Sequence, residues 1–186
     1  MSLLPLGILG QGGPAGGGAF ELIETQILAS TTTAVTFSAI PTIYKHLQIR
    51  ITSRNTTAAA SQAITLRMNG DTGSNYAFFH MRGNGSGGVA ATSSSQTSMT
   101  IGRSPGSTEA ANIFAVGLVD ILDYGNTNKT KSVRSVGARY SSETQIEQVG
   151  AHWNSTSAIT SIEVADRAGS TSFAAGTRIS LYGIGG

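Results

Sequence analysis

The stretch IYKHLQIRITS, residues 43–53, decides the fold class because polar and apolar side chains alternate along it. In an extended chain Leu47, Ile49 and Ile51 fall on one side. The side chains of His46, Gln48, Arg50 and Thr52 fall on the other. Period-two alternation is typical of a β-strand with one buried and one solvated face. The sequence therefore predicts a strand over Ile43–Ser53.

The same pattern recurs along the chain after Phe20, whereas helical periodicity is hard to find. Gln62–Met68 alternates in this way and stops at Asn69-Gly70-Asp71, a strong turn signal. Further strands are predicted at Phe20–Leu28, Ala34–Ile40, Asn75–Arg82, Thr97–Arg103, Asn112–Tyr124, Lys131–Tyr140, Gln145–Trp153, Ala158–Ala165 and Thr177–Ile184. The body, residues 19–186, is therefore predicted to be all-β.

The layering is predicted from Asn112–Tyr124, which carries apolar side chains on both faces. This pattern favours a two-sheet antiparallel sandwich whose central strands are covered on both sides. A jelly roll is the topology we expect, while another Greek-key sandwich or a barrel stays open. The Gly- and Ser-rich stretch Gly83–Thr97 is expected to be the longest and most mobile loop of the body.

Composition narrows the function classes. The 186 residues carry a net charge of +2, and only 12% are charged. Basic residues form no run and aromatic residues are few, which argues against nucleic acid as a partner. No apolar stretch approaches the roughly 20 residues of a membrane-spanning helix, so no membrane partner is expected. Since the chain lacks cysteine, disulfides, thiolate metal sites and a cysteine nucleophile are excluded.

The first 18 residues differ from the body and are predicted to form an extended arm. Seven glycines and Pro14 follow or interrupt a short apolar patch. The apolar side chains are Leu3, Leu4, Leu6, Ile8 and Leu9. Leaving five aliphatic side chains in water is unfavourable, so the arm either folds back onto its own body or lies on a partner. We favour a neighbouring subunit.

Two glycine-rich motifs resemble ligand loops. Gly83–Gly88 matches G-x-G-x-x-G, but no predicted helix follows to receive a pyrophosphate, so a flexible loop is expected. Asn69–Gly73 resembles the start of a calcium loop, yet it lacks the spaced carboxylates and the closing Glu. An Asx-type turn is expected there.

The titratable residues suggest no catalytic or metal site. His46, His80 and His152 have no metal-ligand spacing and are expected to face outward on strands. Asp120 and Asp123 are three residues apart on a predicted strand, so they should face opposite sides, with Asp123 beginning a turn. We expect no enzyme, no cofactor and no metal. A Ser/His/Asp site assembled across strands stays open.

Six segments carry a resemblance to known proteins. They are Phe20–Thr25 (FELIET), Val35–Pro41 (VTFSAIP), Tyr44–Arg50 (YKHLQIR), Met68–Tyr76 (MNGDTGSNY), Ile121–Tyr124 (ILDY) and Ser180–Ile184 (SLYGI). In this order they resemble a group of small structural proteins of tailed-bacteriophage virions, variously head decoration, head fibre or tail proteins. The resemblance implies a virion component and brings no catalytic residues.

Taken with the arm, the resemblance leads us to expect a capsid decoration protein on the head surface, binding as a homotrimer. Its partners would be further copies of itself and the major capsid protein or another virion protein, held through Leu3, Leu4, Leu6, Ile8 and Leu9. The alternative is a tail or fibre adsorption protein that binds a host surface glycan. Its candidate contacts are Tyr140, Trp153 and Asn154, although Trp153 is expected in the core. A carbohydrate-active enzyme would need two convergent carboxylates that the sequence does not place.

Overall fold

The computed structural model describes residues 19–142, 144–167 and 171–185, and within these the chain is an all-β, two-sheet antiparallel sandwich. The strands are β1 (Glu21–Ile27), β2 (Ala34–Phe37), β3 (His46–Ser53), β4 (Ser61–Met68), β5 (Tyr76–Gly83), β6 (Gly88–Gln96), β7 (Met99–Pro105), β8 (Ala115–Ile121), β9 (Lys131–Arg139), β10 (Gln145–Trp153), β11 (Ile162–Asp166) and β12 (Arg178–Ile184). The predicted fold class is confirmed. The predicted arm, residues 1–18, lies outside the described residues.

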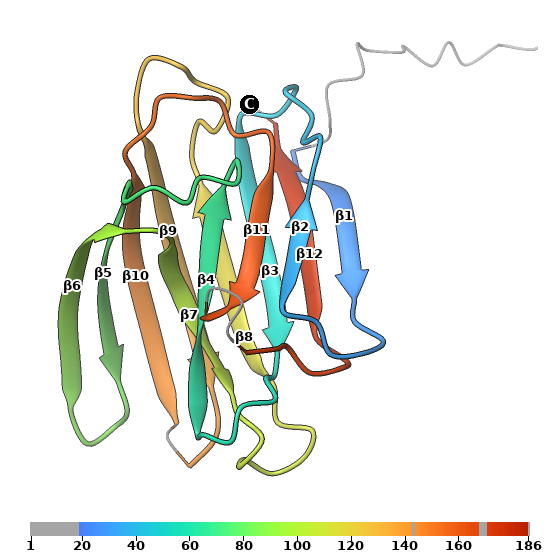
Figure 1. Cartoon of the computed structure of the whole chain (residues 1–186), viewed down its shortest axis with the longest axis vertical. Coiled ribbons are helices and arrows are strands. Elements are labelled where there is room, and N and C mark those ends of the chain that lie inside the picture. The colour runs from blue at the N-terminus through green and yellow to red at the C-terminus, as the bar shows by residue number, and fades with distance from the viewer. Residues whose placement is uncertain (1–18, 143, 168–170, 186) are drawn as a thin grey trace, which may run out of the picture.

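The two sheets differ in size. The larger has eight strands in the order β1-β12-β3-β8-β9-β10-β5-β6, and the smaller has four in the order β2-β11-β4-β7. Figure 1 shows the smaller sheet in front of the larger, with β5 and β6 extending beyond its edge. The chain passes repeatedly between the sheets, as in β1–β2, β3–β4 and β10–β11. This establishes the sandwich but not the jelly-roll order within it.

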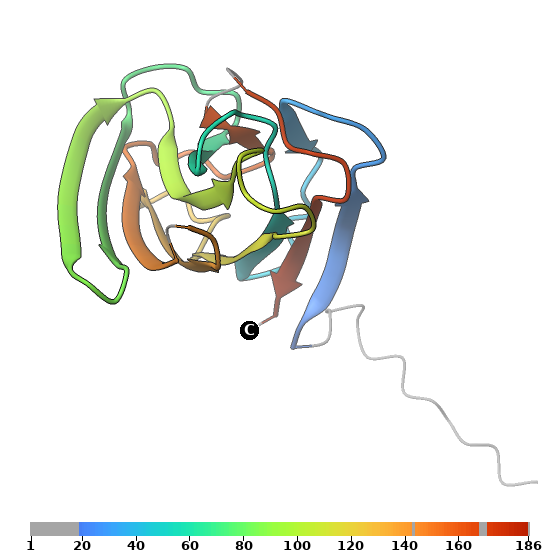
Figure 2. The same cartoon turned by 90° about the horizontal axis from the view of Figure 1, so that it is seen from below.

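The core lies between the sheets and follows the predicted alternation. Leu47 and Ile49 of β3 are fully buried, and so are Leu66 and Met68 of β4 in the opposite sheet. Burial of a side chain of this size stabilises the fold by about 2 kcal/mol before entropy is deducted. The view from below in Figure 2 shows the two layers that enclose this core.

The Gly83–Thr97 prediction is wrong. Gly88–Gln96 forms β6, which pairs with β5 from Gly83↔Gly88 to Tyr76↔Gln96. Within Gly83–Gly88 the side-chain oxygen of Asn84 accepts hydrogen bonds from the backbone N–H groups of Ser86 and Gly87, at 3.1 and 3.0 Å. The motif is therefore a hydrogen-bonded hairpin turn, and no helix follows it.

The Asn69–Gly73 segment forms the predicted Asx-type turn. The backbone N–H of Gly73 donates to Asp71 Oδ1 at 2.8 Å. Before it, Asn69 and Gly70 both have positive φ, 52° and 64°, and Asp71 N–H donates to the Met68 carbonyl at 2.9 Å. This is the pattern of a type I′ turn, which suits an Asn-Gly pair. The turn leads from the smaller sheet to the larger.

Trp153 is buried, as predicted, and belongs to the same corner. Its ring lies nearly parallel to that of Tyr76, with centroids 6.3 Å apart. Its indole N–H donates to Asp71 Oδ2 at 2.7 Å. This bond, with those from Asn75 and the Gly73 backbone, holds the pKa of Asp71 below its usual value.

Candidate interaction surface

The outer face of the large sheet carries an apolar band, defined here by Phe79, Met81, Val116, Leu118, Val136 and Ile146. The strand register sets these side chains on one face in three neighbouring rows. Five of them lie in the rows Leu118↔Val136↔Gln148↔Met81 and Val116↔Ala138↔Ile146↔Gly83. Phe79 lies in the row on the other side of the first, Asp120↔Arg134↔Gly150↔Phe79. Each band residue is 38–65% exposed.

This finding corrects the expectation that the central strands are covered on both faces. Val119 and Ile121 of β8 are fully buried against the smaller sheet, but Val116 and Leu118 of the same strand face away from it. No layer of the described chain covers them. Six side chains that are each about half exposed leave on the order of 500 Å² of apolar surface in water, at the upper end of what a monomer carries.

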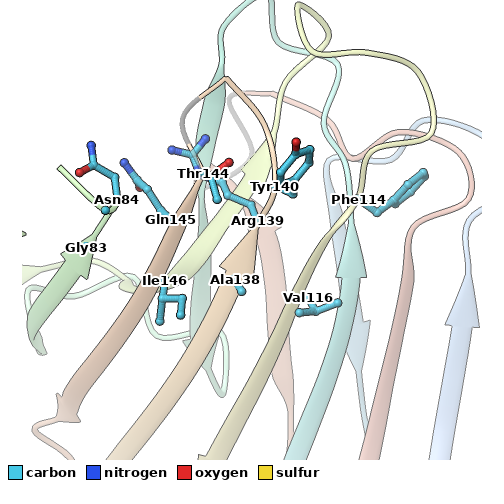
Figure 3. Close-up of a pocket in the computed structure, with 11 residues that line it drawn as sticks. Gly83, Asn84, Phe114, Val116, Ala138, Arg139, Tyr140, Thr144, Gln145 and Ile146 are labelled. Carbon is cyan, nitrogen blue, oxygen red and sulfur yellow. The ribbon is translucent and has the colours of Figure 1, made fainter.

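A shallow hollow of about 550 Å³ lies at one end of the apolar band. Ile146, Val116 and Ala138 form part of its lining, together with Tyr140 and Phe114 (Figure 3). Asn84 of the β5–β6 turn and Gln145 add polar groups at the other rim. The hollow therefore combines an apolar floor with a few polar side chains, a composition typical of a ligand or partner contact.

The other half of the same face is polar. The guanidinium of Arg50 lies over the rings of Phe20 and Tyr182, at 4.9 and 4.7 Å from their centroids. Nearby, Asp120 accepts hydrogen bonds from Gln48 and Arg134, both at 2.8 Å. Burial acts to raise the pKa of Asp120, but these two bonds outweigh it and hold the pKa below the usual value.

The three histidines do not come together. His46 Nδ1 accepts a hydrogen bond from the backbone N–H of Asp123 at 2.9 Å, and His152 lies on the outer face of β10. His80 was expected to face outward, but the register Val149↔His80 sets it on the inner side of β5. Among the described residues no three His, Asp or Glu side chains are grouped closely enough to hold a metal ion.

The two acids of the β8 segment are separated as predicted. Asp120 lies on the outer face of β8, whereas Asp123 has a positive φ of 48° and begins a turn, its carbonyl accepting from Asn126 N–H at 3.0 Å. Lys129 pairs with Asp123. This ion pair outweighs burial and lowers the pKa of the Asp123 carboxyl.

Asp166, at the end of β11, is fully buried. Burial raises the pKa of Asp166 to about 6, against a smaller opposing effect of the Thr171 hydroxyl. Since this acid titrates near 3.9 in an unfolded chain, its charge destabilises the fold above pH 6 and not below about pH 4. The contribution of Asp166 to the free energy of unfolding therefore falls as the pH rises from about 4 to about 6.

We expect Asp166→Asn to raise the free energy of unfolding by about 2 kcal/mol at pH 7.5, because it removes a buried charge. At pH 4, where Asp166 is mostly protonated in the native state, the gain should nearly vanish. Urea unfolding of both proteins at the two pH values, followed by Trp153 fluorescence, measures this difference. Equal gains at both pH values would contradict it.

The structure separates the residues predicted as glycan contacts. Tyr140 is 77% exposed and lines the hollow, whereas Trp153 is 2% exposed. Trp153 and Asn154 lie at the opposite end of β10, about 25 Å away along the strand. Trp153 is thus wrong as a contact because it packs in the core, and Asn154 is exposed but remote from the hollow.

The five predicted arm contacts, Leu3, Leu4, Leu6, Ile8 and Leu9, lie outside the described residues. The apolar band itself was missed. The sequence signal for the band is the apolar character of both faces of Asn112–Tyr124. On its own this pattern favours central strands that are covered on both sides.

No known protein family model matches the chain, and no curated protein sequence is similar to it. Within the described residues no helix is long and apolar enough to cross a membrane.

Proposed function

We propose that the protein is a non-enzymatic structural subunit of a tailed-bacteriophage virion, a capsid decoration protein that binds the head shell as a homotrimer. The observation that carries the proposal is the apolar band on the outer face of the large sheet. A patch of this kind on a rigid β scaffold is typical of a surface that binds another protein. The resemblance of six segments to virion proteins supports the same class.

The size of the band favours a multivalent subunit. A contact that buries about 500 Å² on each partner removes about 1,000 Å² in total, at the low end for a specific interface. One copy alone would therefore bind weakly. Linking three copies raises the effective concentration of the second and third contacts, so that a trimer remains on a shell from which a monomer dissociates.

Labelling virions with an antibody against this protein tests the location. Label over the whole head, with a copy number in the hundreds, is the expected result. A handful of copies confined to the tail would overturn the decoration proposal, and absence from purified particles would overturn the virion assignment.

Two arginine substitutions test whether the apolar band is the contact surface. Val136→Arg introduces a charge into the band, and Ser132→Arg introduces the same charge on the same face of β9 outside it. We expect Val136→Arg to lower binding to shells that lack the protein at least tenfold, and Ser132→Arg to change it less than twofold. Equal effects would show that the band is not the contact.

A second candidate function is adsorption to a host surface glycan, and the hollow beside Tyr140 is the observation that favours it. An exposed tyrosine ring packs against a sugar face, and Asn84 and Gln145 could hydrogen-bond its hydroxyls. Tail-restricted label in the virion experiment, together with loss of host binding in Tyr140→Ala, would favour this function over decoration.

A further inference from the structure

Strand β6 forms one free edge of the large sheet. It is the last strand in the sheet order, and Figure 1 shows it beyond the side of the smaller sheet. Each residue from Gly88 to Thr92 is exposed, and Val89 leaves 49% of its surface in water. Among the described residues β5 is the one strand that pairs with β6, so the other backbone edge of β6 is open to a further strand.

The hydrogen bonds of the β5–β6 hairpin show which backbone groups of β6 point outward. The N–H of Asn84 donates to the carbonyl of Gly87 at 3.2 Å, so these two residues form a hydrogen-bonded pair. In an antiparallel ladder such pairs alternate with pairs whose N–H and C=O groups point away from the partner strand. Counting along the register from this pair, the outward groups belong to Gly88, Ala90 and Thr92. These three residues aim three N–H and three C=O groups away from β5.

The other edges of the two sheets carry features that oppose strand addition, whereas β6 does not. Charged side chains, proline and short length all discourage pairing with a further strand. β1 carries Glu21 and Glu24, β2 has only four residues, and β7 ends at Pro105. β6 has nine residues, none of them charged and none of them proline, and its pairing with β5 is regular over the first six. This edge is therefore suited to accept another strand.

A second copy of β6 is complementary to this edge. In an antiparallel pair centred on Ala90, the two copies of Ala90 oppose each other, and Gly88 of each copy opposes Thr92 of the other. These three pairs exchange two hydrogen bonds each. Between them Val89 of each copy lies opposite Ala91 of the other, in the closer type of pair. All of these side chains are small and uncharged, so self-pairing brings no like charges together and covers the exposed Val89.

The shape of the sandwich leaves room for the second copy. The smaller sheet ends at β7, which packs over β9 and β10, while the large sheet continues to β5 and β6 (Figure 2). Opposed residues of an antiparallel pair share a face, so the two copies are related by a twofold axis perpendicular to the sheet. From β10 of one copy to β10 of the other there are then five strand intervals, about 24 Å. The two smaller sheets therefore do not collide.

We propose that β6 is a self-association edge, at which two copies of the chain pair antiparallel about a twofold axis centred on Ala90. The axis leaves both outer faces on one side, so the row Leu118↔Val136↔Gln148↔Met81↔Ala90 continues into the second copy. The pair presents two apolar bands to one partner surface. A contact between two strand edges buries less than the roughly 1,200 Å² of a standard interface, so it is weak and adds to other contacts between copies. The inference goes beyond the proposed function and does not depend on a virion location.

Because the chain has no cysteine, single engineered thiols report the pairing. Ala90→Cys places two thiols opposite each other at the axis, where a Cα–Cα distance of about 5.5 Å suits a disulfide. Thr92→Cys is the matched control, since it is exposed on the same face of β6 but lies about 14 Å along the strand from its own counterpart. In full-length protein at submillimolar concentration we expect the disulfide-linked dimer of Ala90→Cys to form at least tenfold faster. Equal rates would overturn the proposal.

A mixture of two variants tests the register. Tagged Gly88→Cys and untagged Thr92→Cys are oxidised together, because these two positions oppose each other across the proposed axis. Mixed dimers should exceed the dimers of either variant with itself at least fivefold. Dimers of each variant with itself in the majority would overturn the pairing centred on Ala90.

A measurement without cysteine uses proline. Ala90→Pro removes an outward N–H and leaves the bonds to β5 intact, since Ala90 makes none with that strand. Sedimentation of concentrated protein should show self-association at least tenfold weaker than in the wild type, and Trp153 fluorescence checks that the variant is folded. Val136→Arg, in the apolar band, should change self-association less than twofold. The opposite order would place self-association on the band and overturn the β6 proposal, whereas binding to shells tests the proposed function separately.

Discussion

Replacing Asn69 by alanine is expected to lower the free energy of unfolding by about 4 kcal/mol. The Asn69 amide donates to the Ala158 carbonyl at 2.8 Å, and its oxygen accepts from the Thr160 and Ser161 backbone N–H groups at 2.8 and 3.1 Å. Three lost hydrogen bonds cost about 1 kcal/mol each. Alanine at a φ of 52° adds about 1 kcal/mol, because its Cβ disfavours the left-handed region.

Asn69→Gly is the matched control because glycine keeps the positive φ and removes only the side chain. It should cost about 3 kcal/mol, so the difference between the two variants isolates the backbone contribution. Chemical unfolding followed by fluorescence measures both, since Trp153 is the chain's single tryptophan and is buried. Near wild-type stability of Asn69→Gly would show that the hydrogen bonds contribute little.

The Asn69 bonds explain why the segment MNGDTGSNY is structural. Asn69 ties the β4–β5 connection to the loop before β11, and Asp71 ties it to Trp153 at the end of β10. The segment therefore forms a hydrogen-bonded corner of the sandwich.

Local pattern was sufficient for most of the strands. In β3 the inward residues Leu47, Ile49 and Ile51 are apolar and buried, because this face packs on the core and the other meets water or polar neighbours. The last inward residue, Ser53, is also buried although it is polar. The signal is contained within eleven residues and needs no knowledge of the partner strands. The Asn-Gly turn was predictable for the same reason, since its positive φ values are a local requirement.

Strand β6 could not be predicted from an alternation of polar and apolar residues in its own sequence. Gly88–Gln96 is rich in glycine, alanine and serine, and only Ser93 in it is not exposed, so it has no alternation. The extended conformation of β6 is held by its backbone pairing with β5, which itself pairs with β10. A strand held by its neighbour's hydrogen bonds carries little signal of its own.

The apolar band shows a different limit. Apolar side chains on both faces of β8 are compatible with a covered central strand or with a strand that presents one face to a partner. The sequence of one strand does not show whether another layer of the protein covers each of its faces. The smaller sheet has four strands against eight, and it covers only the inner face of the larger, which leaves Val116 and Leu118 exposed.

Replacing Gly183 by alanine is expected to lower the free energy of unfolding by about 3 kcal/mol. A Cβ at this position in β12 would lie 2.3–2.5 Å from three atoms of the Tyr44 ring, closer than any real contact. Tyr44 is buried against the core, so the ring has little room to move and either it or the strand must shift. Gly150→Ala on β10 is the matched control. Its Cβ would meet no atom within 4 Å, and the expected change is within 0.5 kcal/mol.

A double-mutant cycle assigns the effect to this one contact. Tyr44→Ala is itself destabilising because it removes a buried ring, but it also clears the space that a Cβ on Gly183 needs. In the Tyr44→Ala background we therefore expect Gly183→Ala to cost less than 1 kcal/mol, a coupling of about 2 kcal/mol. Thermal or urea unfolding of the four proteins measures the cycle. If Gly183→Ala costs the same in both backgrounds, the glycine is required for backbone conformation and not for the approach of the ring.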